Sequence, residues 1–446
     1  MLIPAAGVAR GRRDRDQSIV RKDHMNTAPS TVKKYIAVFS LGLCSAASFL
    51  MPFTKFYFYN EWVEAMGCTN QQAGYLMTIY AFANTIFFIP GGWMADRFSA
   101  KKILVYSTFA TAGFNFLFAW NQNYYLALFI WFGLAVTTAF AFWGALMKAV
   151  RLCGNDGEQG KMYGFYNGAD GLFAMAVLFL ATWIFGIFAK DLGGVAGYRG
   201  VLVFQGLMCV VAALMVQFFF VEGLGGEASA DDKMDLKKMG QVARNPATWY
   251  ISIMIFCGYG LYTGSSFLNP YMRDVLGATA AFGAVMATLR NKGCRMVFGP
   301  VGGILADKFK SSALISICFY LFIIAVFIFL LALPVEPGNS RVTTLATIGT
   351  FALAAGIFAV YGIMFSSISE ANFPRSETGT VIGLASIVGY SSDYWFNPLF
   401  GYFIDNSVNG SGYRNIFYFL MGTAVLGIIA SVLVYRHGRK TRPQAA

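Results

Sequence analysis

Six ionisable side chains lie well inside long apolar stretches of the chain. They are Lys55, Asp170, Arg290, Lys292, Arg295 and Asp393. If these stretches cross a membrane, a charge near the bilayer centre costs about 2.5 kcal/mol or more, so each side chain must face protein or water. Four cations and two carboxylates leave a surplus of about two positive charges in a medium of low dielectric constant. We therefore expect these stretches to line a water-filled cavity that attracts an anion.

Arginine suits such a site because its planar guanidinium matches the oxygens of a carboxylate, phosphate or sulfonate. On a helical wheel Lys292 and Arg295 lie about 60° apart, whereas Arg290 lies roughly 140–160° from both. The three cannot all contact one ligand, so at least one is expected to be structural. If instead the charges only pair with one another and Lys55 extends its amine towards the membrane surface, the solute is neutral.

The two carboxylates are candidates for coupling or gating. A carboxylate whose cationic partner moves away can take up a proton. Protonation can therefore be coupled to the conformational change that moves the solute. At a rise of about 1.5 Å per residue, Asp170 and Arg295 lie at similar depths, and Asp393 and Arg290 share a deeper level. This matching predicts two ion pairs, Asp170 with Arg295 and Asp393 with Arg290.

Other chemistries find little support in the residue types. The two histidines, His24 and His437, lie in charged tail segments, and the seven cysteines are scattered singly. Neither pattern can build a metal site or a histidine-based catalytic dyad. We expect no cofactor and no enzymatic activity.

The elements that carry the six charges must be membrane spans. Of the 446 residues 57% are hydrophobic and 13% are charged, whereas soluble domains carry about 25% charged residues. Apolar runs of about 20 residues recur along the whole chain, which predicts an all-α protein in a lipid bilayer. The twelve predicted spans are 35–59, 72–94, 103–120, 124–147, 163–189, 200–221, 248–271, 280–306, 311–334, 344–368, 379–404 and 415–435.

Basic residues predict the orientation of these spans. With both tails on one side, 25 of the 34 Lys and Arg residues lie on that side and 5 on the other. Cytoplasmic loops carry such an excess, so both termini are expected in the cytoplasm, and the basic balance needs no nucleic-acid partner. We expect the chain to act as a monomer.

The longest polar interior stretch divides the chain into two halves of six spans. Residues 1–34 are expected to form a disordered basic tail, and either Met1 or Met25 can be the true start. The predicted units are a tail at 1–34, a bundle at 35–221, a linker at 222–247, a bundle at 248–435 and a tail at 436–446.

An internal repeat supports this division. Gly91-Gly92-Trp93-Met94-Ala95-Asp96-Arg97 follows the second span, and Gly302-Gly303-Ile304-Leu305-Ala306-Asp307-Lys308 follows the eighth, 211 residues later. The pair resembles the loop signature of the major facilitator superfamily, which occurs once in each half. Both copies lack the signature's second glycine, where Ser99 and Lys310 stand. The resemblance implies two pseudo-symmetric six-helix bundles, with gating roles for Asp96, Arg97 and Asp307.

The seventh span suggests a branch of that superfamily. Its Trp249-Tyr250-Ile251 start, its polar run and Pro270 resemble the seventh helix of organophosphate:phosphate antiporters. Where those antiporters carry a substrate-binding arginine this chain has Tyr262, and its cations stand in the eighth span instead. The predicted substrate-binding residues are Lys55, Arg290, Lys292, Arg295, Tyr262, Asn269 and Tyr166.

The sequence thus predicts a secondary active transporter of the inner membrane. It would move a small organic anion by alternating access, by symport with protons or by exchange with another anion. The alternatives are a transporter of a neutral or drug-like solute and a transporter-like sensor that signals to a partner.

Overall fold

A computed structural model describes residues 31–154, 159–222, 236–334, 336–371, 373 and 378–441. Most of the predicted N-terminal tail, both candidate start residues, the middle of the predicted linker and residues 442–446 lie outside this part of the chain. The part that the structure describes is helical throughout and contains no strand.

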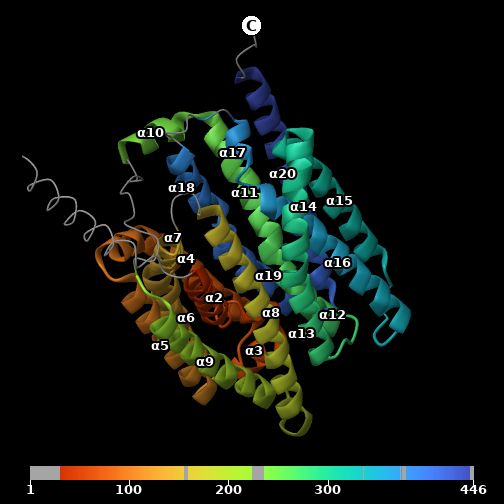
Figure 1. Ribbon diagram of the computed structural model, residues 1–446. Coiled ribbons are helices and arrows are strands. Elements are labelled where there is room, and N and C mark those ends of the chain that lie inside the picture. The colour runs from red at the N-terminus through yellow and green to blue at the C-terminus, as the bar shows by residue number, and fades with distance from the viewer. Residues whose placement is uncertain are drawn as a thin grey trace, which may run out of the picture.

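The first half of the molecule consists of six helical passes, and Figure 1 shows how they are arranged. In order they are α2 (Thr31–Ser48) with η1 (Thr54–Phe56) and α3 (Tyr59–Met66), α4 (Asn70–Arg97), α5 (Ala100–Trp120), α6 (Tyr124–Ala135) with η2 (Val136–Trp143) and α7 (Gly144–Leu152), α8 (Gln159–Leu192), and α9 (Gly194–Phe219).

The second half follows a short helix, α10 (Leu236–Arg244). Its passes are α11 (Pro246–Gly264) with η4 (Ser265–Phe267) and α12 (Leu268–Asp274), α13 (Ala280–Thr288) with η5 (Leu289–Gly293) and α14 (Cys294–Phe309), α15 (Ser312–Ala332), α16 (Ser340–Ile363) followed by α17 (Ser367–Glu370), α18 (Thr378–Gly389) with α19 (Ser392–Asp405), and α20 (Ser411–Thr441). All twelve predicted spans thus correspond to helical passes.

In the part of the chain that the structure describes, eight passes are individually long and apolar enough to cross a membrane. The other four are the first, second, eighth and eleventh, formed by α2–α3, α4, α13–α14 and α18–α19. Three of these four carry buried or central charges, because a helix that faces protein and water does not need an apolar surface.

Several predicted spans are not continuous helices. The first ends at Ser48, and Pro52, which has no backbone N–H to donate, lies in the turn before η1. The eleventh is interrupted between Gly389 and Ser392. The fourth and eighth contain π-helical turns, η2 and η5, and such wide turns often mark functional sites.

The internal repeat produces close helix contacts in both halves. A Cβ atom on Gly91 would lie 2.6 Å from the Phe140 carbonyl oxygen, and one on Gly302 would lie 2.4 Å from that of Ala359. The turns that follow differ, since Lys310 adopts a left-handed φ of 53° whereas Ser99 has a φ of −60°. Ser99 caps α5 and Ser311 caps α15, each by accepting a backbone hydrogen bond.

We call the side at which α2 begins and α20 ends the tail side, and the opposite side the far side. The halves join on the far side, through contacts of α4 with α19, α8 with α13 and α3 with α12. Here Asp405 accepts hydrogen bonds from the backbone N–H groups of Asn70 and Gln71 at 3.0 and 2.8 Å, and Arg273 Nη1 lies 2.5 Å from Glu61 Oε1. The molecule is therefore in a conformation that is closed on the far side.

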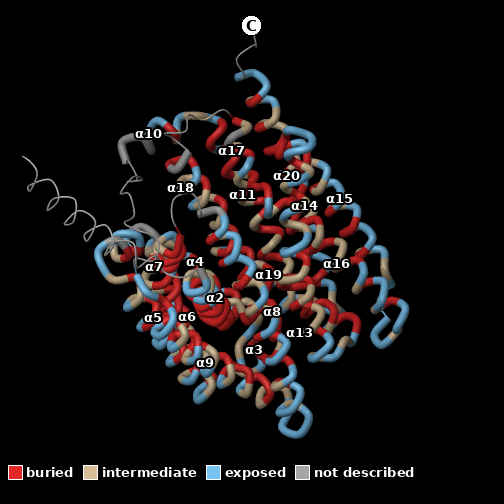
Figure 2. The backbone as a smooth tube through the Cα atoms, viewed as in Figure 1, coloured by how far each residue is buried: buried red, intermediate tan, exposed pale blue. Residues whose placement is uncertain are grey.

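Burial follows the same plan. In Figure 2 exposed residues recur along the outer surfaces of the helices, and buried residues line the contacts between them. The third, sixth, ninth and twelfth passes, α5, α9, α15 and α20, are 39–44% buried in their most apolar windows. The corresponding window is 33% buried in α8 and 72% buried in α11–α12. The less buried helices can face lipid over much of their surface, and α11–α12 packs inside the molecule.

Candidate functional site

The exposed cation of the eighth pass is Arg295, at the start of α14. Its guanidinium carbon lies 5.1 Å from the ring centroid of Tyr361, and the side chain is exposed. Asp170 of α8, in the other half, lies within electrostatic range. An exposed guanidinium between an aromatic ring of one half and a carboxylate of the other indicates a water-accessible space between the halves.

Lys292 lies three residues before Arg295 and is partly exposed. Asp170 acts electrostatically on Lys292 as well. Among the described residues no carboxylate oxygen lies within 4.0 Å of either cation, so the predicted contact pair of Asp170 with Arg295 is not formed in this conformation. Two cations thus share one nearby carboxylate, which leaves positive charge for a ligand to neutralise.

Tyrosines surround this position. Tyr259 lies 4.6 Å from Tyr390, and Tyr262 lies 5.3 Å from Tyr361, between ring centroids. Tyr57 donates a hydrogen bond of 3.4 Å to Asn291 Oδ1 across the two halves. Tyr57 and Asn291 were not predicted from the sequence as site residues. The only sequence feature that could have indicated them is that they lie close to Lys55 and Lys292 in the chain.

Lys55 and Asp393 form the buried polar centre of the far-side closure. Lys55 Nζ lies 3.9 Å from Asp393 Oδ1 and donates a 2.7 Å hydrogen bond to Asn397. Tyr259 and Thr263 donate to the two oxygens of the Asp393 carboxylate at 2.8 and 2.6 Å. The prediction that Asp393 pairs with Arg290 is therefore wrong. Matching residues by their depth did not identify the partner of Asp393. The helix break before η1 places Lys55, and not Arg290, beside this carboxylate.

Arg290 lies apart from the other two cations of its pass. Its side chain is 5% exposed, and its Nη1 donates to Thr350 Oγ1 at 3.3 Å. It lines a small cavity of its own. The helical wheel correctly separated Arg290 from Lys292 and Arg295.

Two further predicted binding residues are held by protein groups in this conformation. Asn269 is buried and its Nδ2 donates to the Tyr57 carbonyl oxygen at 3.0 Å. Tyr166 is also buried and donates to Ser45 Oγ at 3.0 Å. The third, Tyr262, is partly exposed and stacks on Phe56 at 5.2 Å.

The gating candidates lie at the tail-side ends of α4 and α14. Arg97 is exposed and its guanidinium carbon lies 5.4 Å from the Trp93 ring centroid, and Asp307 is also exposed. The side chain of Asp96 lies outside the described atoms. Lys148 Nζ donates to the carbonyl oxygens of Ala95 and Phe98, which ties α7 to the end of α4.

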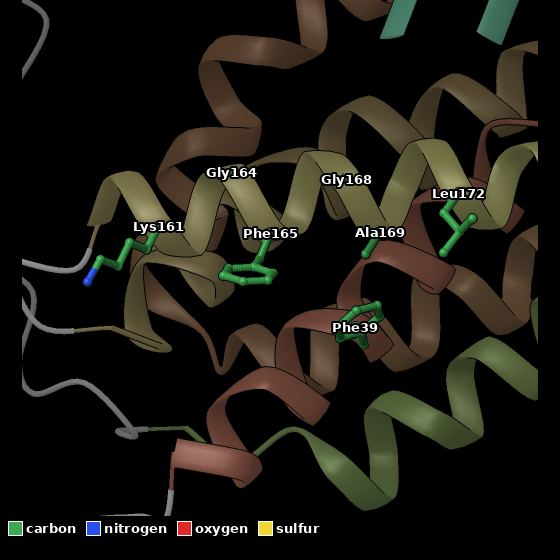
Figure 3. Close-up of a pocket in the computed structure, with 7 residues that line it drawn as sticks. All are labelled: Phe39, Lys161, Gly164, Phe165, Gly168, Ala169 and Leu172. Atoms are coloured by element: carbon green, nitrogen blue, oxygen red, sulfur yellow. The ribbon is translucent and has the colours of Figure 1, made fainter. Parts of the chain in front are cut away.

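The larger cavity, of about 450 Å³, is not at this site. Figure 3 shows its lining along the tail-side part of α8 and at Phe39 of α2. Lys161 is its single charged residue, and the others are apolar or glycine. Because none of the predicted site residues lines it, we do not assign the solute to this cavity.

Comparisons with known proteins agree with this architecture. The family model described as Major Facilitator Superfamily matches residues 36–393. The inner membrane protein YihN of Escherichia coli is 27% identical over 413 residues, which cover 91% of this chain and 96% of that protein.

Several relatives, including the two that follow, have names that state an anionic solute. The probable nitrate transporter NarT of Staphylococcus epidermidis is 22% identical and covers 89% of this chain and 93% of its own. The probable sulfoacetate transporter SauU of Cupriavidus necator is 22% identical over 55% of this chain and 58% of its own. Among solved structures, a bacterial homologue of the human lysosomal transporter Spinster matches with a TM-score of 0.67 and 18% identity, covering 94% of this chain and 100% of that one.

Proposed function

The chain belongs to the major facilitator superfamily, and on this premise we propose that it carries a small organic anion across the inner membrane by alternating access. As a member of that superfamily it is a membrane transporter and not an enzyme. The proposal concerns its solute, the residues that bind it and the way transport is coupled.

The observation that carries the proposal is the pair of cations Lys292 and Arg295. Arg295 is exposed and Lys292 is partly exposed, and Asp170 of the other half lies within electrostatic range of both of them. An anion that enters between the halves would complete the neutralisation, and a planar guanidinium favours a carboxylate or sulfonate with two free oxygens. Two relatives, a probable nitrate transporter and a probable sulfoacetate transporter, support an anionic solute.

The surrounding tyrosines favour an organic anion over a bare inorganic one. Tyr57, Tyr262, Tyr361 and Tyr390 offer hydroxyl groups for hydrogen bonds and ring faces for an apolar or polyol chain. Asp170 is placed to couple solute binding to a proton, since it would lose its cationic neighbours once they hold the anion. We also propose that the tail side faces the cytoplasm, which the bias of Lys and Arg supports.

Thermal unfolding of the purified protein tests the solute class. Carboxylates, sulfonates and phosphate esters should be screened at equal ionic strength, because a ligand of the folded state raises the apparent stability. We expect at least one organic anion to raise the melting temperature in a saturable way, and Arg295→Gln to weaken its apparent affinity roughly tenfold or more, as for a lost charge-assisted contact.

Arg341→Gln is the matched control, because Arg341 is exposed at the start of α16 on the far side. It should respond like the wild type. A screen in which neutral solutes shift the melting temperature and anions do not would refute the proposal.

A further inference from the structure

Arg290 is a buried cation without a charged partner among the described residues. It is 5% exposed, and no carboxylate oxygen of the described chain lies within 4.0 Å of it. Its hydrogen bond to Thr350 is long, at 3.3 Å. Thr350 Oγ1 donates its own hydrogen to the Thr347 carbonyl oxygen at 2.9 Å, so it offers Arg290 a neutral lone pair and no charge.

Such an arrangement is costly unless something else neutralises it. A guanidinium carries five N–H donors and keeps its charge in proteins. Burying a charge without compensation is strongly unfavourable. A water molecule can satisfy a donor, but it brings no negative charge.

The side chain lines a cavity that fits a small ion. The cavity is bordered by Arg290 and Asn291 of η5, and the rest of its lining is apolar except for Ser265. The lining residues are Phe56, Ser265, Leu268, Ala287, Arg290, Asn291, Ala354 and Phe358. The volume open to the centre of a water-sized sphere is about 10 Å³, which is roughly what one water or an ion of similar size needs. An organic carboxylate or sulfonate does not fit.

We propose that this cavity is a site for a small monovalent inorganic anion of halide size, with chloride as the natural occupant. Arg290 supplies the counter-charge, and the Asn291 amide supplies neutral donors beside it. The site is distinct from the solute position at Arg295, so this inference goes beyond the proposed function.

The lining also links the site to the conformation of the transporter. Phe56 belongs to η1 of the first half, whereas the other seven lining residues belong to the second half. Phe56 is held there by stacking on Tyr262 at 5.2 Å between ring centroids. The first half therefore closes the site, and a bound anion should stabilise the conformation that is closed on the far side.

Halide-dependent thermal unfolding tests the proposal. Sodium chloride or bromide should replace sodium gluconate at constant ionic strength. We expect the melting temperature of the wild type to rise by a few degrees and to saturate, as binding to a single site requires. Arg290→Gln should abolish this response. Arg295→Gln, the matched control in the same pass, should keep the halide response, while its apparent affinity for the organic solute falls roughly tenfold or more.

A second measurement does not depend on the stability of a variant. In crystals of the wild type grown in bromide, anomalous scattering should give a peak in the cavity between Arg290 and Phe56. An equal halide response in Arg290→Gln and the wild type, a wild type without halide response, or an empty cavity at saturating bromide would each overturn the proposal. None of these results bears on the solute at Arg295, so the two proposals fail separately.

Discussion

The buried ion pair of Lys55 with Asp393 shows how far single residues could be read from the sequence. The presence of a charge in an apolar stretch correctly predicted that both side chains face the protein interior, because lipid excludes them. The choice of partner could not be predicted, since it depends on the turn at Pro52 that moves Lys55 towards α19. Partners of buried charges depend on breaks in helices, which depth counting ignores.

The carboxylate of Asp170 allows a prediction at the same scale. Asp170→Asn removes the negative charge that Lys292 and Arg295 share. We expect solute binding to be kept or strengthened, while the pH dependence of uptake into proteoliposomes becomes flat, because the proposed proton acceptor is gone. The control is Asp191→Asn, at an exposed position near the far-side end of α8. Full transport with an unchanged pH profile in Asp170→Asn would remove this residue from coupling.

At the scale of elements, the repeat after the second and eighth passes was the most informative pattern. Glycines at the end of a helix allow close approach of a neighbouring helix, and one glycine of each pair makes such a contact. The sequence alone could not say which glycine of each pair makes the contact. The structure assigns it to Gly91 and Gly302, whereas a Cβ atom on Gly92 or Gly303 would meet nothing within 4 Å.

This difference gives a matched pair of substitutions. Gly302→Ala places a methyl group 2.4 Å from the Ala359 carbonyl oxygen, so α14 and α16 must separate. We expect a loss of about 1–3 kcal/mol in stability, as for other overpacked sites. Gly303→Ala should be neutral or slightly stabilising, because alanine favours helix. Melting temperatures of the two variants provide the comparison, and equal values would contradict the assignment.

For the whole molecule, the far-side closure is the feature that sequence patterns did not foresee. Asp405 lies at the end of α19 and binds the first backbone N–H groups of α4, a helix from the other half. A carboxylate at a helix N-terminus is favourable because it meets unpaired donors and the positive end of the helix dipole. No local sequence pattern around Asp405 predicts a hydrogen-bond partner more than 300 residues away in the chain.

Asp405→Ala should therefore loosen the closure. The loss of a helix cap is worth about 1 kcal/mol, which corresponds to a shift of roughly fivefold in the balance between closed and open conformations. Maleimide labelling of a cysteine placed at Asn269, a buried position of α12 near the far side, should become faster by a similar factor in membrane vesicles. Asp191→Ala, in the same cysteine variant, is the control and should leave the labelling rate unchanged. Unchanged labelling would show that Asp405 does not hold the two halves together.

The uneven apolar character of the passes also has a consequence for biosynthesis. Within the described residues, the first, second, eighth and eleventh passes fall outside the set of helices that are both long and apolar enough to span lipid alone. The eighth carries Arg290, Lys292 and Arg295, and a charge at a helix centre costs about 2.5–3.5 kcal/mol on insertion. A newly made eighth pass therefore cannot settle in the bilayer until other helices of its half are beside it, so truncation of the chain just after Phe309 should leave this segment outside the membrane.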